Sequence, residues 1–449
     1  MTKKVFFNDT LKETADILSE LSVKLPIKEP PLIIRDIYGR IRVAFNQEGK
    51  DVEGYEKAID KEWSKLGSYG EYEGKKVLSR DDFFDPDSVF ESADILDYEA
   101  PESGKKIRIL DRQITGQEWT RLASSDITQV NKVPVPRLVF YGLKGGVGRS
   151  TAMAILAYHL AKKGKNVLLI DFDLESPGLS GLMLPPDRMA EFGIVDWFVE
   201  DAVGQGNEIL PAMISICPLS QAEGVTGRIQ VAAASGMNEP AYLAKLSRVY
   251  ADIPRKEGEG IERFPERMVR LVKSLEEQEK PDVILIDSRA GLHDLAAVSI
   301  VGLGTKTFLF AVDSTQTWQG YRLLFSHWQL YPAIATKVRE HLTVVDTLFP
   351  ETNQEAHAKS FLEHSYDLFS STLYDEIPPG SDRPDSDVFN FDMGDPEAPH
   401  YPRRIKWNAR FQEFSVNLLT EKILAPADIE AAYGDFLSGA ELLIEEEYL

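Results

Sequence analysis

The chain has 449 residues, of which 50 are Lys or Arg and 72 are Asp or Glu, so its formal net charge is −22. This length is enough for two or three domains with hydrophobic cores of their own. Because the mean field of so acidic a chain repels phosphate, the composition argues against general nucleic-acid binding and against anionic membranes. The single cysteine, Cys217, excludes an internal disulfide and a cysteine-based zinc site, and it fits a reducing cytoplasm.

The first part of the chain, residues 1–133, is predicted to form a separate α+β domain. We expect an amphipathic helix over residues 11–21, a hairpin of two strands over 32–45, a helix over 52–66 and a strand over 105–110. Thr115 and Glu118 have the spacing of a capping box and predict a further helix start. No catalytic residues stand out, so a regulatory or partner-binding role and a purely structural role both stay open. No apolar run in the chain reaches the roughly 18 residues of a membrane-spanning helix.

A strand, a glycine-rich loop and a helix open the second predicted domain, residues 137–449. The strand is apolar over 138–141, and the helix extends to Lys163. Glycines at 145, 146 and 148 allow the backbone amides to turn inward. The helix adds its free N–H groups and the positive end of its dipole at the same point. This combination predicts a phosphate-binding loop in which Ser150 offers a hydroxyl group to Mg²⁺.

The loop differs from the common pattern G-x-x-x-x-G-K-[ST] at two positions, because Leu143 replaces the first glycine and Arg149 replaces the lysine. It also carries an early lysine, Lys144. The run KGGVGRS resembles the deviant Walker A loop of the ParA/MinD group of P-loop ATPases, in a sub-branch whose loop reads KGGVGR. The resemblance implies that Lys144 reaches the nucleotide of a second subunit. It also implies that the nucleotide is bound by Gly145, Gly146, Val147, Gly148, Arg149, Ser150 and Thr151.

A second acidic feature follows the apolar strand at 166–170, which ends in Asp171 and Asp173. Two carboxylates spaced i, i+2 at the end of a strand face the same way, and ligands of parallel sheets bind at that edge. A turn that begins with an acidic residue would explain one of these two aspartates. It is a less natural explanation of the pair. The segment is similar to the ParA/MinD Asp-x-Asp sequence. By that match Asp173 aligns the attacking water and Asp171 lies near the Mg²⁺ ion.

The apolar strand at 282–286 ends in Asp287, as a Walker B strand does, and Asp287 is predicted to hold Mg²⁺. By the same resemblance, Gly291 brings a backbone N–H group to the terminal phosphate. Arg289 stands where relatives often carry proline, and both a phosphate contact and a surface salt bridge stay open for it. Strands and helices alternate from residue 137 onward. The predicted fold is therefore an α/β P-loop NTPase with a mainly parallel sheet flanked by helices.

The resemblance, which covers about residues 137–346, implies a cytoplasmic ATPase with ATP and Mg²⁺ as cofactors. Asp173, Lys144 and Arg149 are the expected catalytic residues, and the expected metal ligands are Ser150, Asp171 and Asp287. ATP is expected to join two copies into a homodimer that controls a protein partner in a bacterial regulatory or conflict system. Arginine is not equivalent to lysine at position 149, so we expect slow turnover. A non-hydrolysing nucleotide sensor is the alternative.

Three related functions fit the sequence less well. A partitioning ATPase needs a basic surface for DNA, and the acidic balance of the chain argues against it. A membrane-cycling relative ends in a basic amphipathic helix, whereas this chain ends in three glutamates, Tyr448 and Leu449. A bacterial tyrosine kinase carries a tyrosine-rich tail, and here Tyr448 stands alone. His357 and His364 share a helical face but have no further ligands nearby in sequence, so we expect no metal site there.

Overall fold

A computed structural model of the protein describes residues 4–24, 29–100, 104–121, 135–237, 240–255, 260–377 and 388–446. The chain divides into two compact units, Met1–Ser124 with His327–Ala335, and Ser125–Ser326 with Thr336–Leu449. Residues 122–134, which include the end of the first predicted domain, lie outside the described residues. No helix in the described ranges is both long and apolar enough to cross a membrane.

The first unit is a mixed five-stranded sheet with the strand order β3-β2-β1-β5-β4. Its strands are β1 (Leu32–Arg35), β2 (Ile41–Ala44), β3 (Val77–Leu78), β4 (Ile95–Glu99) and β5 (Lys106–Asp111), and its helices are α1 (Thr10–Lys24), α2 (Gly49–Trp63) and α3 (Pro86–Phe90). The predicted hairpin is confirmed, because β1 and β2 pair in antiparallel register. Its turn is closed by the Asp36 side chain, which accepts the backbone N–H groups of Tyr38 and Arg40.

The two faces of this sheet are covered differently. Residues of α1 and α2 pack with one face of the strands around the fully buried Trp63. The other face has a smaller apolar cluster, to which α3 contributes Phe90. The predicted capping box is wrong, since Gly116 precedes a 3₁₀ turn of only three residues, Gln117–Trp119, without a side-chain cap. Glu118 instead pairs with Arg121.

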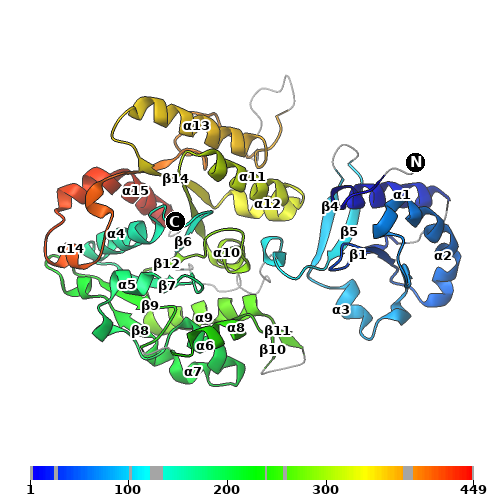
Figure 1. The fold of residues 1–449 in the computed structure, drawn as a ribbon, viewed down its shortest axis with the longest axis horizontal. Coiled ribbons are helices and arrows are strands. Elements are labelled where there is room, and N and C mark those ends of the chain that lie inside the picture. Colours follow the sequence, from blue (N-terminus) through cyan, green and yellow to red (C-terminus); the bar gives the residue numbers. More distant parts are fainter. Residues whose placement is uncertain are drawn as a thin grey trace. The chain divides into compact units, whose positions relative to one another are not determined.

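The second unit is built on an eight-stranded sheet in the order β15-β14-β13-β6-β12-β7-β9-β8, as the α/β prediction required (Figure 1). All neighbouring strands are parallel except β8 and β9. The strands of the sheet are β6 (Arg137–Gly142), β7 (Asn166–Asp171), β8 (Ile214–Ile216), β9 (Arg228–Ala232), β12 (Val283–Asp287), β13 (Lys306–Ala311), β14 (Leu342–Phe349) and β15 (Arg403–Lys406), and a separate small hairpin is formed by β10 (Ile253–Pro254) and β11 (Ile261–Glu262).

Helices flank this sheet on both faces (Figure 1). The helices of this part of the chain are α4 (Arg149–Lys162), α5 (Leu179–Met183), α6 (Ile194–Ala202), α7 (Gly206–Ile209), α8 (Tyr242–Val249), α9 (Phe264–Glu279), α10 (Asp294–Ala297), α11 (Thr315–Gln329), α12 (Pro332–Arg339), α13 (Gln354–Ser370), α14 (Asn417–Thr420) and α15 (Pro426–Glu446), with a π-helical turn at Val298–Leu303. The last residues of α11 and the first residues of α12 belong to the first unit. The helices α4, α5, α14 and α15 share one apolar core with the strands. On the opposite face, Tyr141 of β6 contacts Tyr321 of α11. A sheet covered on both faces explains why its strands are apolar throughout rather than alternating.

Candidate functional site

The strand order brings three predicted segments to one edge of the sheet. β12 lies between β6 and β7, and Asp287 at its end is in register with Phe140 of β6 and with Asp171 of β7. The glycine-rich loop follows β6, while the Asp-x-Asp segment continues from β7. Because all three strands are parallel, their carboxyl ends meet, and this is where ligands bind in open α/β sheets.

The loop between β6 and α4 needs glycine at two of its positions. Gly146 and Gly148 have φ angles of +77° and +83°, a region that side chains with a Cβ rarely adopt. Gly145 has no such requirement. A Cβ atom at any of these three positions would meet no other atom within 4 Å, so the space beside the loop is open. Gly148 is the N-cap of α4, and the free N–H groups of this helix begin at Arg149.

Ser150 and Asp287 are joined directly at this edge. The Ser150 hydroxyl donates to Asp287 Oδ2 at 2.7 Å. The other oxygen, Oδ1, is buried without a hydrogen bond, and the Arg149 guanidinium lies 3.9 Å away. Buried carboxylate oxygens are normally satisfied, so this one has a coordination position to offer. A hydroxyl and an acidic oxygen are ligands that suit Mg²⁺, which also retains water and takes phosphate oxygens.

Asp171 is fully buried, and backbone groups occupy both of its oxygens. The N–H group of Asp173 donates to Oδ1 at 3.1 Å, and that of Leu179 donates to Oδ2 at 3.3 Å. Burial raises the pKa of Asp171 well above its usual range, and the nearby charge of Asp287 adds to this effect. In this arrangement Asp171 holds the segment after β7 to the start of α5. Each of these oxygens accepts one bond and keeps a further lone pair, so the place of Asp171 near a metal ion stays a prediction.

Asp173 lies between two arginines. Arg149 Nη2 is 3.3 Å from Asp173 Oδ2, and Arg289 Nη1 is 2.8 Å from Oδ1. The Arg149 side chain is buried and also donates to the carbonyl group of Ser288. For Arg289, the sequence left open a phosphate contact or a surface salt bridge. Its partner in the structure is the predicted water-aligning carboxylate itself.

Two further predicted residues have partners within the chain. Lys144 is exposed, and its ammonium group donates to the side chain of Gln316 at the start of α11. The Gly291 N–H group donates to the Gly142 carbonyl at 3.1 Å. The predicted contact of this N–H group with phosphate would require that bond to open. Tyr141 also donates to the Gly291 carbonyl at 3.1 Å, so the turn is held from both sides.

The sequence did not point to a set of residues that holds the segment after Asp173. The Tyr250 hydroxyl bonds to Glu175, and Arg289 Nε and His293 Nε2 lie 3.5 and 3.6 Å from the same carboxylate. Tyr242 donates to the Leu174 carbonyl at 2.6 Å. The one available signal was the acidic position of Glu175 in the run that contains Asp171 and Asp173. The tyrosines belong to no motif.

Histidines 357 and 364 each face an aspartate of the sheet edge formed by β13 and β14. His357 Nε2 lies 3.1 Å from Asp346, and His364 Nδ1 lies 2.9 Å from Asp313. Across the described ranges, no three His, Cys, Asp or Glu side chains are grouped as metal ligands.

Comparisons with known proteins identify the region that contains this site. Residues 138–297 match the family model of the CobQ/CobB/MinD/ParA nucleotide binding domain. Over 57 residues, the chain is 40% identical to the chromosome-partitioning ATPase Soj of Thermus thermophilus, a match that covers 13% of this chain and 23% of Soj. The chain therefore spans less than a quarter of the length of that curated relative.

Solved structures of the same group show only a distant likeness. A cobyrinic acid a,c-diamide synthase from Mycobacterium smegmatis, with a bound ATP analogue and magnesium, is 15% identical with a TM-score of 0.37, over 55% of this chain and 86% of that chain. The ParA protein of pNOB8, bound to nonspecific DNA, is 17% identical with a TM-score of 0.34, over 53% and 75%.

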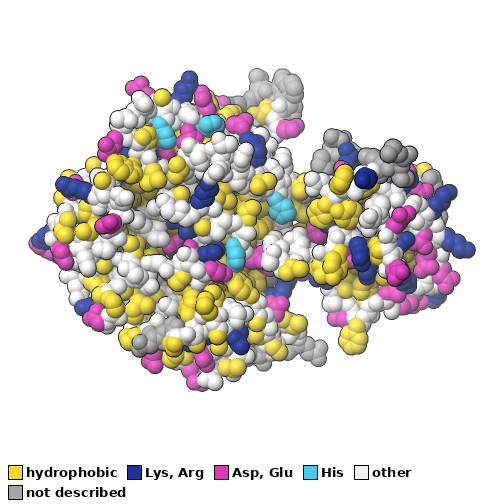
Figure 2. Space-filling model, viewed as in Figure 1, with side chains coloured by type: hydrophobic (Ala, Val, Ile, Leu, Met, Phe, Trp, Pro, Cys, Tyr) yellow, Lys and Arg dark blue, Asp and Glu magenta, His cyan; other side chains and the backbone are white. Residues whose placement is uncertain are grey.

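The expectation that the chain avoids nucleic acid stays a prediction. Net charge is a weak guide here, because a local basic surface can bind DNA on an acidic protein. On the face that Figure 2 presents, Lys and Arg side chains are interspersed with Asp and Glu side chains.

Proposed function

We propose that the protein is a slow, Mg²⁺-dependent ATPase, on the premise that residues 138–297 match the family model of the CobQ/CobB/MinD/ParA nucleotide binding domain. Its ATP-bound form is a homodimer that controls a protein partner. The observation that carries the proposal is the meeting of the glycine-rich loop, the Ser150–Asp287 pair and Asp173 at one sheet edge. The similarity to Soj, an ATPase, supports ATP as the nucleotide.

In this proposal, the glycine-rich loop and the start of α4 bind the phosphates. The backbone N–H groups of residues 145–151 and the helix dipole supply positive charge without a large side chain. Arg149 adds a full charge and a planar fork of donors that suits phosphate oxygens. Ser150 and Asp287 would hold Mg²⁺, which neutralises charge on the phosphates when it is bound.

Hydrolysis needs a carboxylate that orients the attacking water, and Asp173 has this role in the proposal. Both of its oxygens are engaged by guanidinium groups in the structure. An aspartate held in this way is a weak acceptor for water, because its negative charge is already compensated. Arg149 would turn from Asp173 toward the phosphates, but Arg289 would still hold the carboxylate. This supports slow turnover.

We propose that Lys144 takes part in dimerisation. Its side chain is exposed, and among the described residues its ammonium group bonds only to Gln316. A lysine that is not required by its own loop is free to reach a nucleotide in a second copy. We propose that this happens in the reducing cytoplasm, where the one cysteine, Cys217, stays a buried free thiol. A protein of a bacterial regulatory or conflict system would be the partner.

A non-hydrolysing nucleotide sensor is the second candidate, and the two arginines around Asp173 favour it. A test that separates the two measures binding of a fluorescent ATP analogue and release of phosphate with purified wild type and Asp173→Asn. The ATPase proposal predicts that both proteins bind Mg-ATP and that only the wild type releases phosphate above background. Equal release of phosphate at background level from both proteins would support the non-hydrolysing sensor. Absence of binding by the wild type would contradict both.

A further inference from the structure

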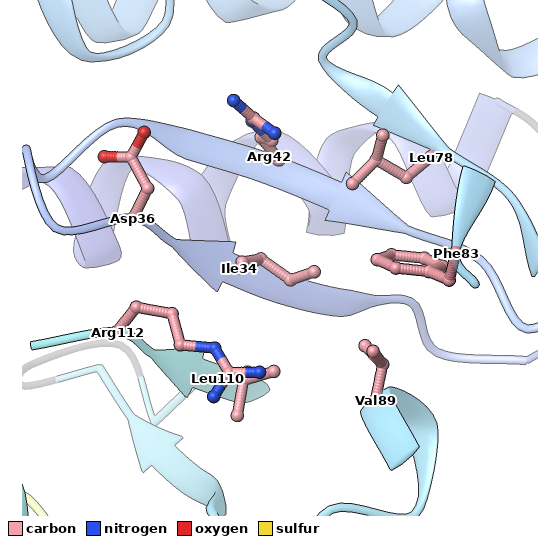
Figure 3. Close-up of a pocket in the computed structure, with 8 residues that line it drawn as sticks. All are labelled: Ile34, Asp36, Arg42, Leu78, Phe83, Val89, Leu110 and Arg112. Atoms are coloured by element: carbon pink, nitrogen blue, oxygen red, sulfur yellow. The ribbon is translucent and has the colours of Figure 1, made fainter. Parts of the chain in front are cut away.

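The first unit carries a pocket of about 210 Å³ on one face of its sheet. Its floor is formed by Ile34, Leu78 and Leu110, from three different strands, and Phe83 and Val89 form one wall (Figure 3). The helices α1 and α2 pack against the opposite face of this sheet, and α3 covers this face only in part. The floor and the wall therefore leave an apolar recess open to solvent.

The two ends of the pocket differ in chemistry. The charged side chains Asp36, Arg42 and Arg112 lie away from Phe83 and Val89, with Arg42 and Arg112 on opposite sides of Ile34 (Figure 3). Asp36 is already used by two backbone N–H groups of its turn. Arg42 has a buried Nε without a hydrogen bond, and its guanidinium lies 5.7 Å from the centre of the Tyr72 ring.

Arg112 is exposed, and within the described ranges its side chain makes no hydrogen bond, ion pair or ring contact. Two guanidinium groups against one carboxylate give this end a positive balance on a chain whose net charge is −22. The pocket therefore offers an apolar recess beside donors that suit a carboxylate.

The size of the pocket selects among ligands. Pockets for cofactors and drug-sized molecules have volumes of about 300 to 1,000 Å³. A volume of about 210 Å³ suits a single large apolar side chain better than a whole cofactor.

We propose that this pocket binds an acidic peptide segment of a partner protein. An aliphatic or aromatic side chain of the segment enters the recess between Phe83 and Val89, and carboxylates that flank this side chain pair with Arg42 and with Arg112. Anionic molecules of cofactor size are disfavoured by the small volume of the recess. This inference does not rest on nucleotide binding, because every residue that it uses belongs to the first unit.

The test uses the full-length protein as bait for a library of short random peptides displayed on phage. The proposal predicts enrichment of peptides in which a large apolar residue is flanked by Asp or Glu. The affinity of an enriched peptide is then measured by fluorescence anisotropy. Arg112→Glu is expected to weaken binding about tenfold or more, since it replaces attraction by repulsion. Val89→Trp, which fills the recess, is expected to abolish binding.

The matched control is Lys57→Glu, the same charge reversal at an exposed position of α2, and it should leave the affinity within about twofold. Circular dichroism and thermal melting show whether each variant folds. If Val89→Trp does not fold, Arg112→Glu still tests the proposal, because Arg112 is exposed. Failure to enrich any peptide would overturn the proposal. So would enriched peptides without acidic residues, or an affinity that Arg112→Glu does not change.

Discussion

Ser150 Oγ donates to Asp287 Oδ2 at 2.7 Å, which joins the start of α4 to the end of β12. The two residues are 137 positions apart in the chain, and the parallel pairing of β6 with β12 brings them together. The pair leaves the second oxygen of Asp287 buried and unbonded. A divalent cation bound there would satisfy that oxygen and use the hydroxyl of Ser150 at the same time.

We predict that Ser150→Ala weakens Mg-ATP binding about tenfold or more, since the variant loses one ligand of the cation. Binding of ATP in the presence of EDTA should change much less, because the loop amides are intact. Titration calorimetry with and without Mg²⁺ measures both. Ser247→Ala, at an exposed position of α8, is the control. An equal loss of affinity with and without the metal would exclude the proposed role of Ser150.

Arg289 restrains Asp173 in this account, so we predict that Arg289→Ala raises the rate of phosphate release several-fold. The reason is that Asp173 would regain a free oxygen for the attacking water. The affinity for Mg-ATP should stay within about threefold. Phosphate release at saturating ATP measures the effect, with Arg255→Ala, an exposed arginine paired with Glu266, as the control. A slower variant would instead show that Arg289 assists the reaction.

For dimerisation, we predict that Lys144→Ala binds Mg-ATP but stays monomeric, because its own loop does not need this ammonium group. Size-exclusion chromatography with light scattering is done in the Asp173→Asn background, so that ATP is not consumed. The Asp173→Asn protein alone should double its mass when Mg-ATP is added. Lys273→Ala, an exposed lysine of α9, should behave in the same way as that parent. A mass that never changes with ATP would remove the dimer from the proposal.

Asp346 gives a pH dependence that is separate from the nucleotide site. Burial raises the pKa of its carboxyl group from 3.8 to about 6, although His357 opposes the shift. Because the folded pKa is the higher one, folding favours the protonated acid, and this contribution to stability is lost as the pH rises from about 4 to 6. Above pH 7 the buried charge is a net cost.

We therefore predict that Asp346→Asn is more stable than the wild type by about 2 kcal/mol at pH 7.5, and equal to it near pH 4. Urea unfolding at the two pH values measures the difference. Thr343→Ser, on the same strand, is a control that carries no titratable group. A variant less stable than the wild type at pH 7.5 would show that the His357 pairing outweighs the burial of the charge.

The sequence predicted the parts of the fold that are set by local pattern. The apolar strands ending at Asp171 and Asp287 and the glycine-rich loop are continuous segments, so their strand and loop character could be recognised. Their meeting at one edge followed from the parallel order of an α/β sheet. Gly146 and Gly148 stand at the positions of positive φ, where the backbone requires them.

The remaining site contacts depend on side chains that the sequence places far apart. Arg289 and Asp173, which form an ion pair, are 116 residues apart in the chain. Nothing in the sequence around Arg289 distinguishes it from a surface arginine. Tyr250 reaches Glu175 over 75 residues and belongs to no motif. Such contacts arise from tertiary packing, which local spacing does not encode.

Two helix predictions failed for reasons that the structure makes plain. At Thr115 and Glu118 the capping spacing is present, but Gly116 takes a left-handed conformation with a φ angle of +85°. From the sequence we also expect a helix over 410–424, but this segment forms only a 3₁₀ turn and the short α14, and Lys422 has a φ angle of +58°. Its residues Phe411, Phe414, Val416, Leu419 and Leu424 are buried in the core without the regular spacing of one helical face, while Ile423 is exposed.

The most direct test of the account is a crystal structure of the protein grown with Mg²⁺ and a non-hydrolysable ATP analogue. The account predicts the β- and γ-phosphates against the backbone N–H groups of residues 145–151. It also predicts a Mg²⁺ ion bound near Ser150 and Asp287, with Arg149 turned away from Asp173. A nucleotide bound elsewhere, or an empty loop in crystals grown at saturating analogue, would contradict it.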